Sequence, residues 1–183
     1  HNPEFTMLEF YYAYSNYEEL MAMTEELLKK LFREFGLRDE IDYQGKKLNF
    51  KFPIKRVKFA DLIKEKTSID IEKADDFEKL KKEIEKKNLK EVNIKHSKHY
   101  GALLDELYKR VIRPNIIQPI FLTHYPVEMI ALAKRNEKNP RFINTFQLIV
   151  DGAEIVKAYD ELNDPLDQEE RLKEQAELKQ KGD

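Results

Sequence analysis

The chain has 183 residues, enough for one substantial hydrophobic core, and its 41% hydrophobic and 37% charged residues are typical of a globular domain rather than a disordered one. The 33 basic and 35 acidic side chains nearly cancel, so a net charge of -2 excludes a global field that draws the whole molecule to nucleic acid or an anionic membrane. The absence of cysteine excludes disulfides and thiolate metal sites and fits a cytoplasmic location. No apolar run approaches the roughly 20 residues that span a bilayer, so we expect no membrane partner.

The first 36 residues predict a strand followed by an amphipathic helix. Residues 5–14 are rich in aromatics, and the alternation of a strand would put Phe5, Glu9 and Tyr11 on one face. Ser15 followed by Glu18 has the spacing of a capping box, and apolar residues then recur at helical intervals until Gly36. We therefore expect a helix that is capped at Ser15.

The middle of the chain predicts mainly helices. After an extended stretch at 48–52, closed by Pro53, residues 59–113 carry three helical patterns of apolar residues, and Pro114 stops the last of them. The central part of this region is rich in Lys and Glu, which favours a solvated helical excursion over the centre of a core.

The last third predicts strands and then one helix. Residues 118–124 and 142–150 are strand candidates, Asp151-Gly152 signals a tight turn, and residues 153–162 form the returning strand of an antiparallel hairpin. From Asp164 the chain is mostly charged, which predicts a surface helix. Strands separated by unequal helical stretches favour an α+β fold with an antiparallel sheet.

Glu9 is an acidic residue within an otherwise aromatic and aliphatic segment. With Tyr11 beside it, the carboxylate could receive an ammonium group, and Phe5 on the same face could stack on a base. Alternatively, the strand lies at a sheet edge that faces water, where a Glu costs little. The residues alone leave both interpretations open.

A second strand carries a similar combination. Lys157, Tyr159 and Glu161 share one face of the hairpin's returning strand, whereas Glu154 falls on the opposite parity. Two strands that each bring a Tyr and a Glu could frame a pocket for a cation. Polar strand edges are the alternative.

Other candidates are weaker. His96 and His99 have the spacing of one helical face and could hold a metal, although histidines at helix ends are more common. A basic cluster could contact phosphate or could belong to a solvated loop; its members are Lys134, Arg135, Lys138 and Arg141. The five glycines are isolated from one another, which excludes a P-loop or a dinucleotide fingerprint.

Three stretches carry a resemblance to a known family. Residues 1–17, HNPEFTMLEFYYAYSNY, closely resemble the second half of motif 2 in bacterial-type lysyl-tRNA synthetases, which are class II enzymes. Residues 118–128, QPIFLTHYPVE, with LAKRN at 132–136, look like the segment after that family's helical insertion. DGAEI at 151–155, YDELNDP at 159–165 and DQEER at 167–171 resemble the stretch before motif 3. The resemblance covers essentially the whole chain.

The resemblance implies a fold, a reaction and a set of site residues. The fold is an antiparallel sheet flanked by helices, with residues 1–183 as a partial catalytic domain, a helical insertion at about 59–113 and a charged C-terminal helix at about 164–183. The reaction uses ATP and Mg²⁺ to form lysyl-adenylate and then transfers lysine to tRNA(Lys). By position, His1 and Phe5 would contact ATP, Glu9, Tyr11, Tyr159 and Glu161 would contact lysine, and Glu154 would hold magnesium, which requires a local bulge or twist in its strand.

The chain departs from the family's pattern in one region. Gln147 stands at the position of a second metal-binding Glu, Lys157 replaces a lysine-contacting Asn, and Val156 and Ala158 replace flanking glycines. A cation at Lys157 would repel a lysine substrate or occupy its acidic pocket. These changes argue against ordinary lysine activation.

The resemblance also bears on activity. The family's catalytic arginines would lie before His1 and after Asp183, so we expect none within the chain and very weak or no aminoacylation by the isolated chain. The intact parent would be a homodimer. The leading hypothesis is a fragment of a lysine-tRNA ligase; the alternatives are a diverged non-catalytic interaction module and a ligase that attaches a lysine-like amino acid to a protein.

Overall fold

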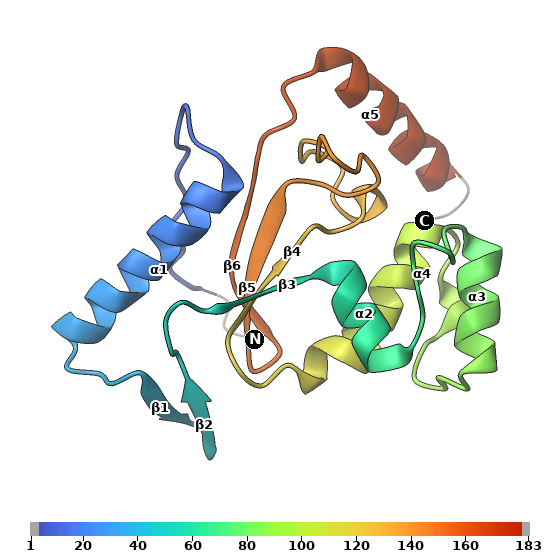
Figure 1. Ribbon diagram of the computed structural model, residues 1–183. Coiled ribbons are helices and arrows are strands. Elements are labelled where there is room, and N and C mark those ends of the chain that lie inside the picture. The colour runs from blue at the N-terminus through green and yellow to red at the C-terminus, as the bar shows by residue number, and fades with distance from the viewer. Residues whose placement is uncertain (1–3, 181–183) are drawn as a thin grey trace.

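The computed structural model describes residues 4–180, with side chains to residue 178. Figure 1 shows a central sheet with α1 on one side and α2, α3 and α4 on the other. The elements in chain order are α1 Tyr17–Glu34, β1 Glu40–Tyr43, β2 Lys46–Asn49, β3 Lys55–Lys58, α2 Phe59–Thr67, α3 Phe77–Lys86, the 3₁₀ turn η1 Ile94–His96, α4 Tyr100–Leu107, the π-helical turn η2 Tyr108–Ile112, the 3₁₀ turn η3 Arg113–Asn115, β4 Ile120–Thr123, the 3₁₀ turn η4 Val127–Met129, β5 Thr145–Val150, β6 Ala153–Tyr159 and α5 Pro165–Gln180.

The central sheet has the strand order β3-β4-β5-β6. The β4–β5 and β5–β6 pairs are antiparallel, whereas β3 pairs with β4 in parallel. β1 and β2 form a separate antiparallel hairpin. The predicted α+β class is confirmed, with one parallel pair in an otherwise antiparallel sheet.

The β5–β6 hairpin forms at the predicted turn. Asp151 has φ 48° and Gly152 has φ 71°, and a two-residue turn with both angles positive matches the twist of the flanking strands. Glycine takes this conformation without steric cost, and Asp is among the few other residues that tolerate it.

Apolar residues from the two faces of the sheet enter two separate cores. Phe121, Phe146 and Leu148 pack with Tyr17 and Met21 of α1. On the opposite face, residues such as Leu122, Ile143 and Ile149 pack with the helices of the 59–113 region, which supply most of the larger core. The sheet is therefore buried on both faces along β4 and β5, and this keeps the edge strand β6 in a fixed position.

The Lys- and Glu-rich middle of the helical region is not a solvated excursion. Leu80 and Ile84 of α3 are fully buried, and they belong to the larger core together with Leu103 and Leu107 of α4. α3 is therefore an amphipathic helix: Leu80 and Ile84 are buried and Phe77 is partly buried on its apolar side, and most of its charged residues face outward.

Helix α1 forms as predicted, but its cap is Asn16 rather than Ser15. The Asn16 side chain accepts hydrogen bonds from the backbone N–H groups of Glu18 and Glu19, at 2.9 and 3.0 Å. The Ser15 hydroxyl instead donates to the Glu19 carboxylate at 2.8 Å. Both residue types are good caps, so the sequence could not decide between neighbours.

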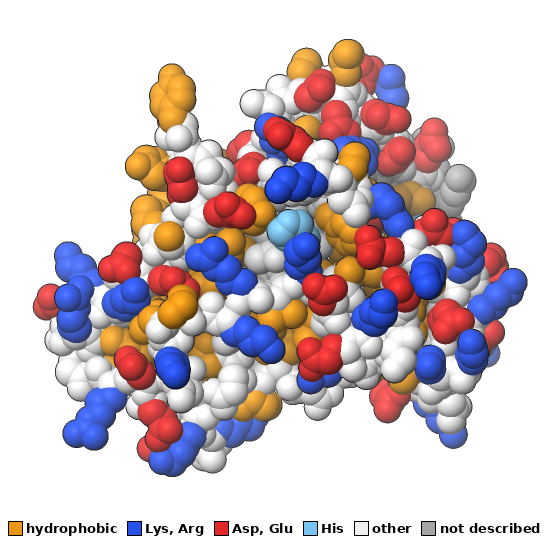
Figure 2. Space-filling model, in the orientation of Figure 1, with side chains coloured by type: hydrophobic (Ala, Val, Ile, Leu, Met, Phe, Trp, Pro, Cys, Tyr) orange, Lys and Arg blue, Asp and Glu red, His pale blue; other side chains and the backbone are white. Residues whose placement is uncertain are grey.

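The predicted strand at residues 5–14 does not form. Its described residues join no ladder, and its large apolar side chains are exposed, including Phe5, Met7, Leu8, Phe10 and Tyr12. A strand requires a neighbour for its N–H and C=O groups, and no described strand pairs with this segment. In Figure 2 apolar side chains crowd its tip and the adjoining end of α1. The alternation reflects the aromatic and apolar residues of this segment, but the strand that it predicted was wrong.

No helix in the described part of the chain is long and apolar enough to cross a membrane.

Candidate functional site

The register of the β5–β6 hairpin sets which side chains share a face. Lys157 lies opposite Gln147 and Tyr159 opposite Thr145, as in any regular antiparallel pair. The register then shifts by one residue, so that Ile149 lies opposite Glu154 and Ile155 is the extra residue of a β-bulge. Because one extra residue reverses the alternation, Glu154 comes to the same face as Lys157 and Tyr159. The bulge that the family resemblance required is present.

The side chains beneath this face form a buried polar contact. The Tyr125 hydroxyl donates a hydrogen bond of 2.5 Å to the Gln147 side-chain oxygen. Burial raises the pKa of Tyr125 well above its ordinary value, so the phenol keeps its proton and remains a donor. Tyr125 also packs against the rings of Phe59 and Tyr108, at centroid distances of 4.7 and 6.2 Å. Sequence analysis missed Tyr125, because nothing in the local pattern distinguishes a Tyr at the end of a strand from a core residue.

Glu9, Tyr11, Tyr159 and Glu161 lie in one electrostatic neighbourhood. The Tyr11 hydroxyl donates to the Glu9 carboxylate at 3.0 Å, and this bond is the largest cause of a raised Tyr11 pKa, to which the charges of Glu161 and Tyr159 also contribute. Burial raises the pKa of Tyr159, and the carboxylates of Glu161 and Glu9 raise it further. Glu161 thus affects the pKa of Tyr11, and Glu9 that of Tyr159, although each pair is 150 positions apart in the sequence.

These four residues line one broad cleft together with Glu154 and Lys157. The cleft follows the free edge of β6, between the N-terminal segment and the loop that precedes β5. Three carboxylates against one ammonium make this stretch of the cleft acidic, which suits a ligand that carries more than one positive charge.

Of the two predicted ATP contacts, only Phe5 lies within the described residues. Phe5 is 80% exposed and does not line the cleft. His1 lies outside the described residues. Both assignments to ATP therefore continue to depend on the family resemblance.

The donor set on this face does not fit a metal ion held by two carboxylates. Gln147 is neutral, and its side-chain oxygen already accepts the Tyr125 hydrogen bond. The ammonium-bearing Lys157 is its cross-strand partner, and within β5 and β6 Glu154 is the one carboxylate on this face. Within residues 4–180, no group of three or more His, Asp or Glu side chains is placed to hold a metal.

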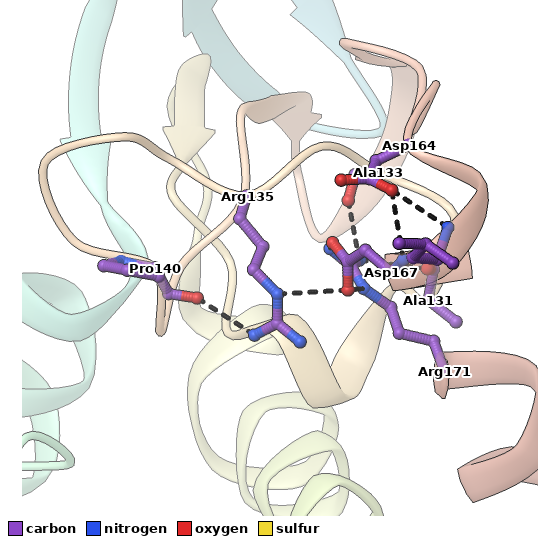
Figure 3. A network of polar contacts seen from close by, with 8 residues as sticks. Ala131, Ala133, Arg135, Pro140, Asp164, Asp167 and Arg171 are labelled. Atoms are coloured by element: carbon purple, nitrogen blue, oxygen red, sulfur yellow. Dashed lines mark hydrogen bonds and ion pairs between the residues drawn. The ribbon is translucent and has the colours of Figure 1, made fainter. Parts of the chain in front are cut away.

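A network centred on Arg171 fixes the strand end that carries Glu161 (Figure 3). Arg171 is 3% exposed, and its guanidinium donates to Asp167 at 2.6 and 2.9 Å and to the carbonyls of Ala131 and Ala133 at 3.0 and 2.7 Å. Ala133 in turn forms an antiparallel bridge with Glu161. Helix α5 thus holds the segment that pairs with the last residues of the candidate site.

The weaker candidates have structural roles. His99 caps α4, because its Nδ1 accepts from the backbone N–H of Ala102 at 3.3 Å. In the basic cluster, Arg135 bonds to Asp167 and to the Pro140 carbonyl, and Arg141 donates to the carbonyls of Ile71 and Glu72. These hydrogen bonds connect separate loops, which gives Arg135 and Arg141 a structural role.

The described chain thus combines a mixed sheet flanked by helices with an acidic, tyrosine-lined cleft along one strand edge. The chain belongs to the class II tRNA synthetases (D, K and N), whose family model matches residues 1–183. Among curated proteins, lysine–tRNA ligases from Porphyromonas gingivalis and Thermotoga maritima are each 40% identical, and that from Chloroflexus aurantiacus is 38% identical. Each comparison covers 100% of this chain but 31%, 35% and 37% of the respective relative, so the chain spans about a third of their length.

Proposed function

We propose that this chain is the part of a lysine–tRNA ligase that receives the amino acid. The observation that carries the proposal is the convergence of Glu9 and Tyr11 with Tyr159 and Glu161 around one acidic cleft. Lysine carries two ammonium groups, and a carboxylate beside a phenol offers each of them a charge-assisted hydrogen bond. The family and the relatives named lysine–tRNA ligase support joining of lysine to tRNA as the reaction class of the whole protein, and the motif resemblance adds activation of lysine with ATP.

The residues assigned to lysine have distinct expected roles. Glu161, whose backbone is paired with Ala133, would present a fixed carboxylate to one ammonium group. Glu9 would present the second carboxylate, with Tyr11 orienting it through the 3.0 Å hydrogen bond. Tyr159, packed against the larger core, would supply a neutral phenol beside both. The two carboxylates then favour positively charged partners, which discriminates against neutral side chains.

The proposal also covers nucleotide binding. ATP is the proposed nucleotide, with Phe5 and His1 assigned by resemblance. Glu154 would provide a single oxygen for Mg²⁺ that arrives with the phosphates, because Mg²⁺ is commonly bound through one or two carboxylates plus substrate phosphates. A homodimeric parent and a cytoplasmic location belong to the same proposal.

One observation favours a second candidate, a diverged non-catalytic synthetase-like module. Lys157 lies directly opposite Gln147, so the hairpin face carries an ammonium where the resemblance leads one to expect a lysine-contacting Asn, and an amide where it leads one to expect a second metal-binding Glu. A ligase that attaches a lysine-like amino acid to a protein would share the same pocket, and no contact in the described residues favours it over a tRNA ligase.

The test is lysine-dependent exchange of pyrophosphate into ATP by the full-length protein that contains this chain. We expect exchange that requires lysine and is strongly reduced in Glu161→Gln. Glu177→Gln, an exposed carboxylate on α5, is the matched control and leaves exchange unchanged. A folded full-length protein without exchange at any lysine concentration would favour the non-catalytic module.

A further inference from the structure

Asp160 lies between the two candidate lysine contacts Tyr159 and Glu161, and it is connected to three separate parts of the chain. Its side chain accepts from the backbone N–H of Tyr17 at 2.6 Å and from the side-chain amide of Asn144 at 3.0 Å. Its own N–H donates to the Asn144 carbonyl at 2.9 Å, and its carbonyl accepts from the N–H of Lys134 at 2.8 Å. The start of α1, the residue before β5 and the 132–134 segment thus meet at one residue.

The contact with Tyr17 joins the two halves of the candidate site. Tyr17 is the first residue of α1, and the segment with Glu9 and Tyr11 leads directly into it. The N–H of a first helical residue has no partner within its helix, and a carboxylate there also interacts favourably with the positive end of the helix dipole. The Asn16 side chain satisfies the N–H groups of Glu18 and Glu19, so Asp160 supplies the acceptor that Tyr17 lacks.

The environment of Asp160 makes this contact specific. The carboxylate is partly buried, and burial raises its pKa although both of its hydrogen-bond donors lower it. Holding a desolvated carboxylate here is costly unless both oxygens are bonded, as they are. The Tyr17 ring is also buried and meets the His124 ring edge-on at 5.9 Å, so the start of α1 is seated on the end of β4 as well.

We propose that Asp160 is a positioning residue, one that fixes the start of α1 against β6 and thereby sets the distance between the Glu9–Tyr11 pair and the Tyr159–Glu161 pair. The relevance of Asp160 to lysine recognition rests on the function proposed above. The Asp160–Tyr17 contact that joins β6 to α1 does not depend on that function. Without the link, the exposed segment 4–14 has no strand ladder to hold it beside β6.

The first experiment measures that distance without any ligand. The chain has no cysteine, so single cysteines at Tyr12 and Ile155, both exposed, accept a pair of nitroxide labels. Dipolar EPR should give a narrow distance distribution in the otherwise unchanged chain and in Asp160→Asn, which keeps an oxygen for the Tyr17 N–H. Asp160→Ala should give a broad distribution. Asp164→Ala is the matched control, because Asp164 bonds to the N–H groups of Leu166 and Asp167 at the start of α5, and it should leave the distribution narrow.

The second experiment measures the consequence for lysine. Titration of the same chain with L-lysine should show an affinity roughly threefold to tenfold weaker in Asp160→Ala than in the parent, with recovery in Asp160→Asn. If Asp160 only stabilised the fold, Asp160→Ala would lower thermal stability, but lysine affinity would not fall in Asp160→Ala and recover in Asp160→Asn. If the chain with Asp160 intact fails to bind lysine while the label distances behave as expected, the proposed function fails and the positioning role of Asp160 stands.

An unchanged, narrow distribution in folded Asp160→Ala overturns the proposal. Should that variant not fold, Asp160→Ser replaces it, because the Ser hydroxyl is one bond shorter than the carboxylate and does not reach the Tyr17 N–H as the Asn oxygen does. Asp160→Ser should therefore also broaden the distribution. The proposal is also overturned if the distance distribution in Asp160→Ser is as narrow as in the chain with Asp160 intact.

Discussion

The Tyr125 hydroxyl and the Gln147 side chain form a 2.5 Å hydrogen bond beneath the face that carries Lys157 and Glu154. Gln147 is 7% exposed, and its amide oxygen is committed to that bond. This pair, rather than a second carboxylate, occupies the position at which the family resemblance leads one to expect a metal ligand.

We therefore predict that two substitutions create a cation site. Gln147→Glu with Lys157→Asn puts two carboxylates on one face of the hairpin and removes the competing ammonium, and carboxylates are the preferred ligands of Mg²⁺ and Mn²⁺. Mn²⁺ binding followed by EPR should become saturable in the double variant. Gln44→Glu with Lys47→Asn, on the separate hairpin, is the control. Equal binding by the control and the site variant would show that Gln147 is not at a latent metal position.

The buried guanidinium of Arg171 predicts a large loss of stability on truncation. Arg171→Ala leaves the carbonyls of Ala131 and Ala133 without this donor and leaves Asp167 with Arg135 as its remaining cationic partner. Removing one partner of a buried ion pair costs about 3–5 kcal/mol. Urea denaturation should show this loss. Lys173→Ala, which breaks an exposed pair with Glu169 on the same helix, should cost less than about 1 kcal/mol. Similar losses in both variants would contradict the assigned role of Arg171.

Two substitutions at the start of α1 test whether Asn16 or Ser15 caps the helix. Asn16→Ala removes an acceptor used by two backbone N–H groups and should lower the free energy of unfolding by about 0.5–2 kcal/mol. Ser15→Ala removes a solvent-exposed hydroxyl–carboxylate contact and should change it by less than about 0.5 kcal/mol. Thermal or chemical denaturation decides between them, and the reverse order would restore Ser15 as the cap.

His124 predicts a pH dependence of stability. Burial lowers its pKa, and the charge of Lys58 lowers it further, so the folded chain keeps the ring neutral while the unfolded chain protonates it near the ordinary value of 6.5. The unfolded state then binds more protons, and stability falls as the pH drops below 6.5.

His124→Asn should make that fall shallower between pH 7 and roughly pH 5, a window that covers the ordinary titration range of His. Asn suits the position because residue 124 has φ 55°, a left-handed conformation that Asn tolerates. Identical pH profiles for the parent and His124→Asn would contradict this assignment.

Local patterns were sufficient for much of the fold. The hairpin was predictable because Asp151-Gly152 is a turn with its own conformational requirement, and α1 because apolar residues recur over 18 positions. The strand expected at 5–14 failed for the opposite reason: pairing depends on a distant neighbour, which no local pattern can supply. The Lys and Glu residues of α3 suggested a solvated helix for the same reason. Leu80 is buried because α4 packs against it, and the local sequence does not indicate this contact.

The site was predictable to the extent that it depends on residue types and parity. Tyr159 and Glu161 were placed together by alternation, and Glu154 joins their face only through a bulge at Ile155 that the sequence does not signal. Tyr125, Asp160 and Arg171 were missed because their roles consist of contacts across 22, 143 and 38 positions of the chain. A side chain that positions another has no local signature.

The most direct test of the account is an NMR titration of the chain with L-lysine and, separately, with L-norleucine, which has the same side-chain length without the terminal ammonium. We predict saturable shifts for lysine at the amides of residues 9–11 and 159–161, weaker shifts in Glu161→Gln, and no comparable shifts with norleucine. Equal responses to the two amino acids, or no saturable response to lysine at either segment, would contradict the claim that acidic and phenolic groups from both ends of the chain form one receptor for a cationic amino acid.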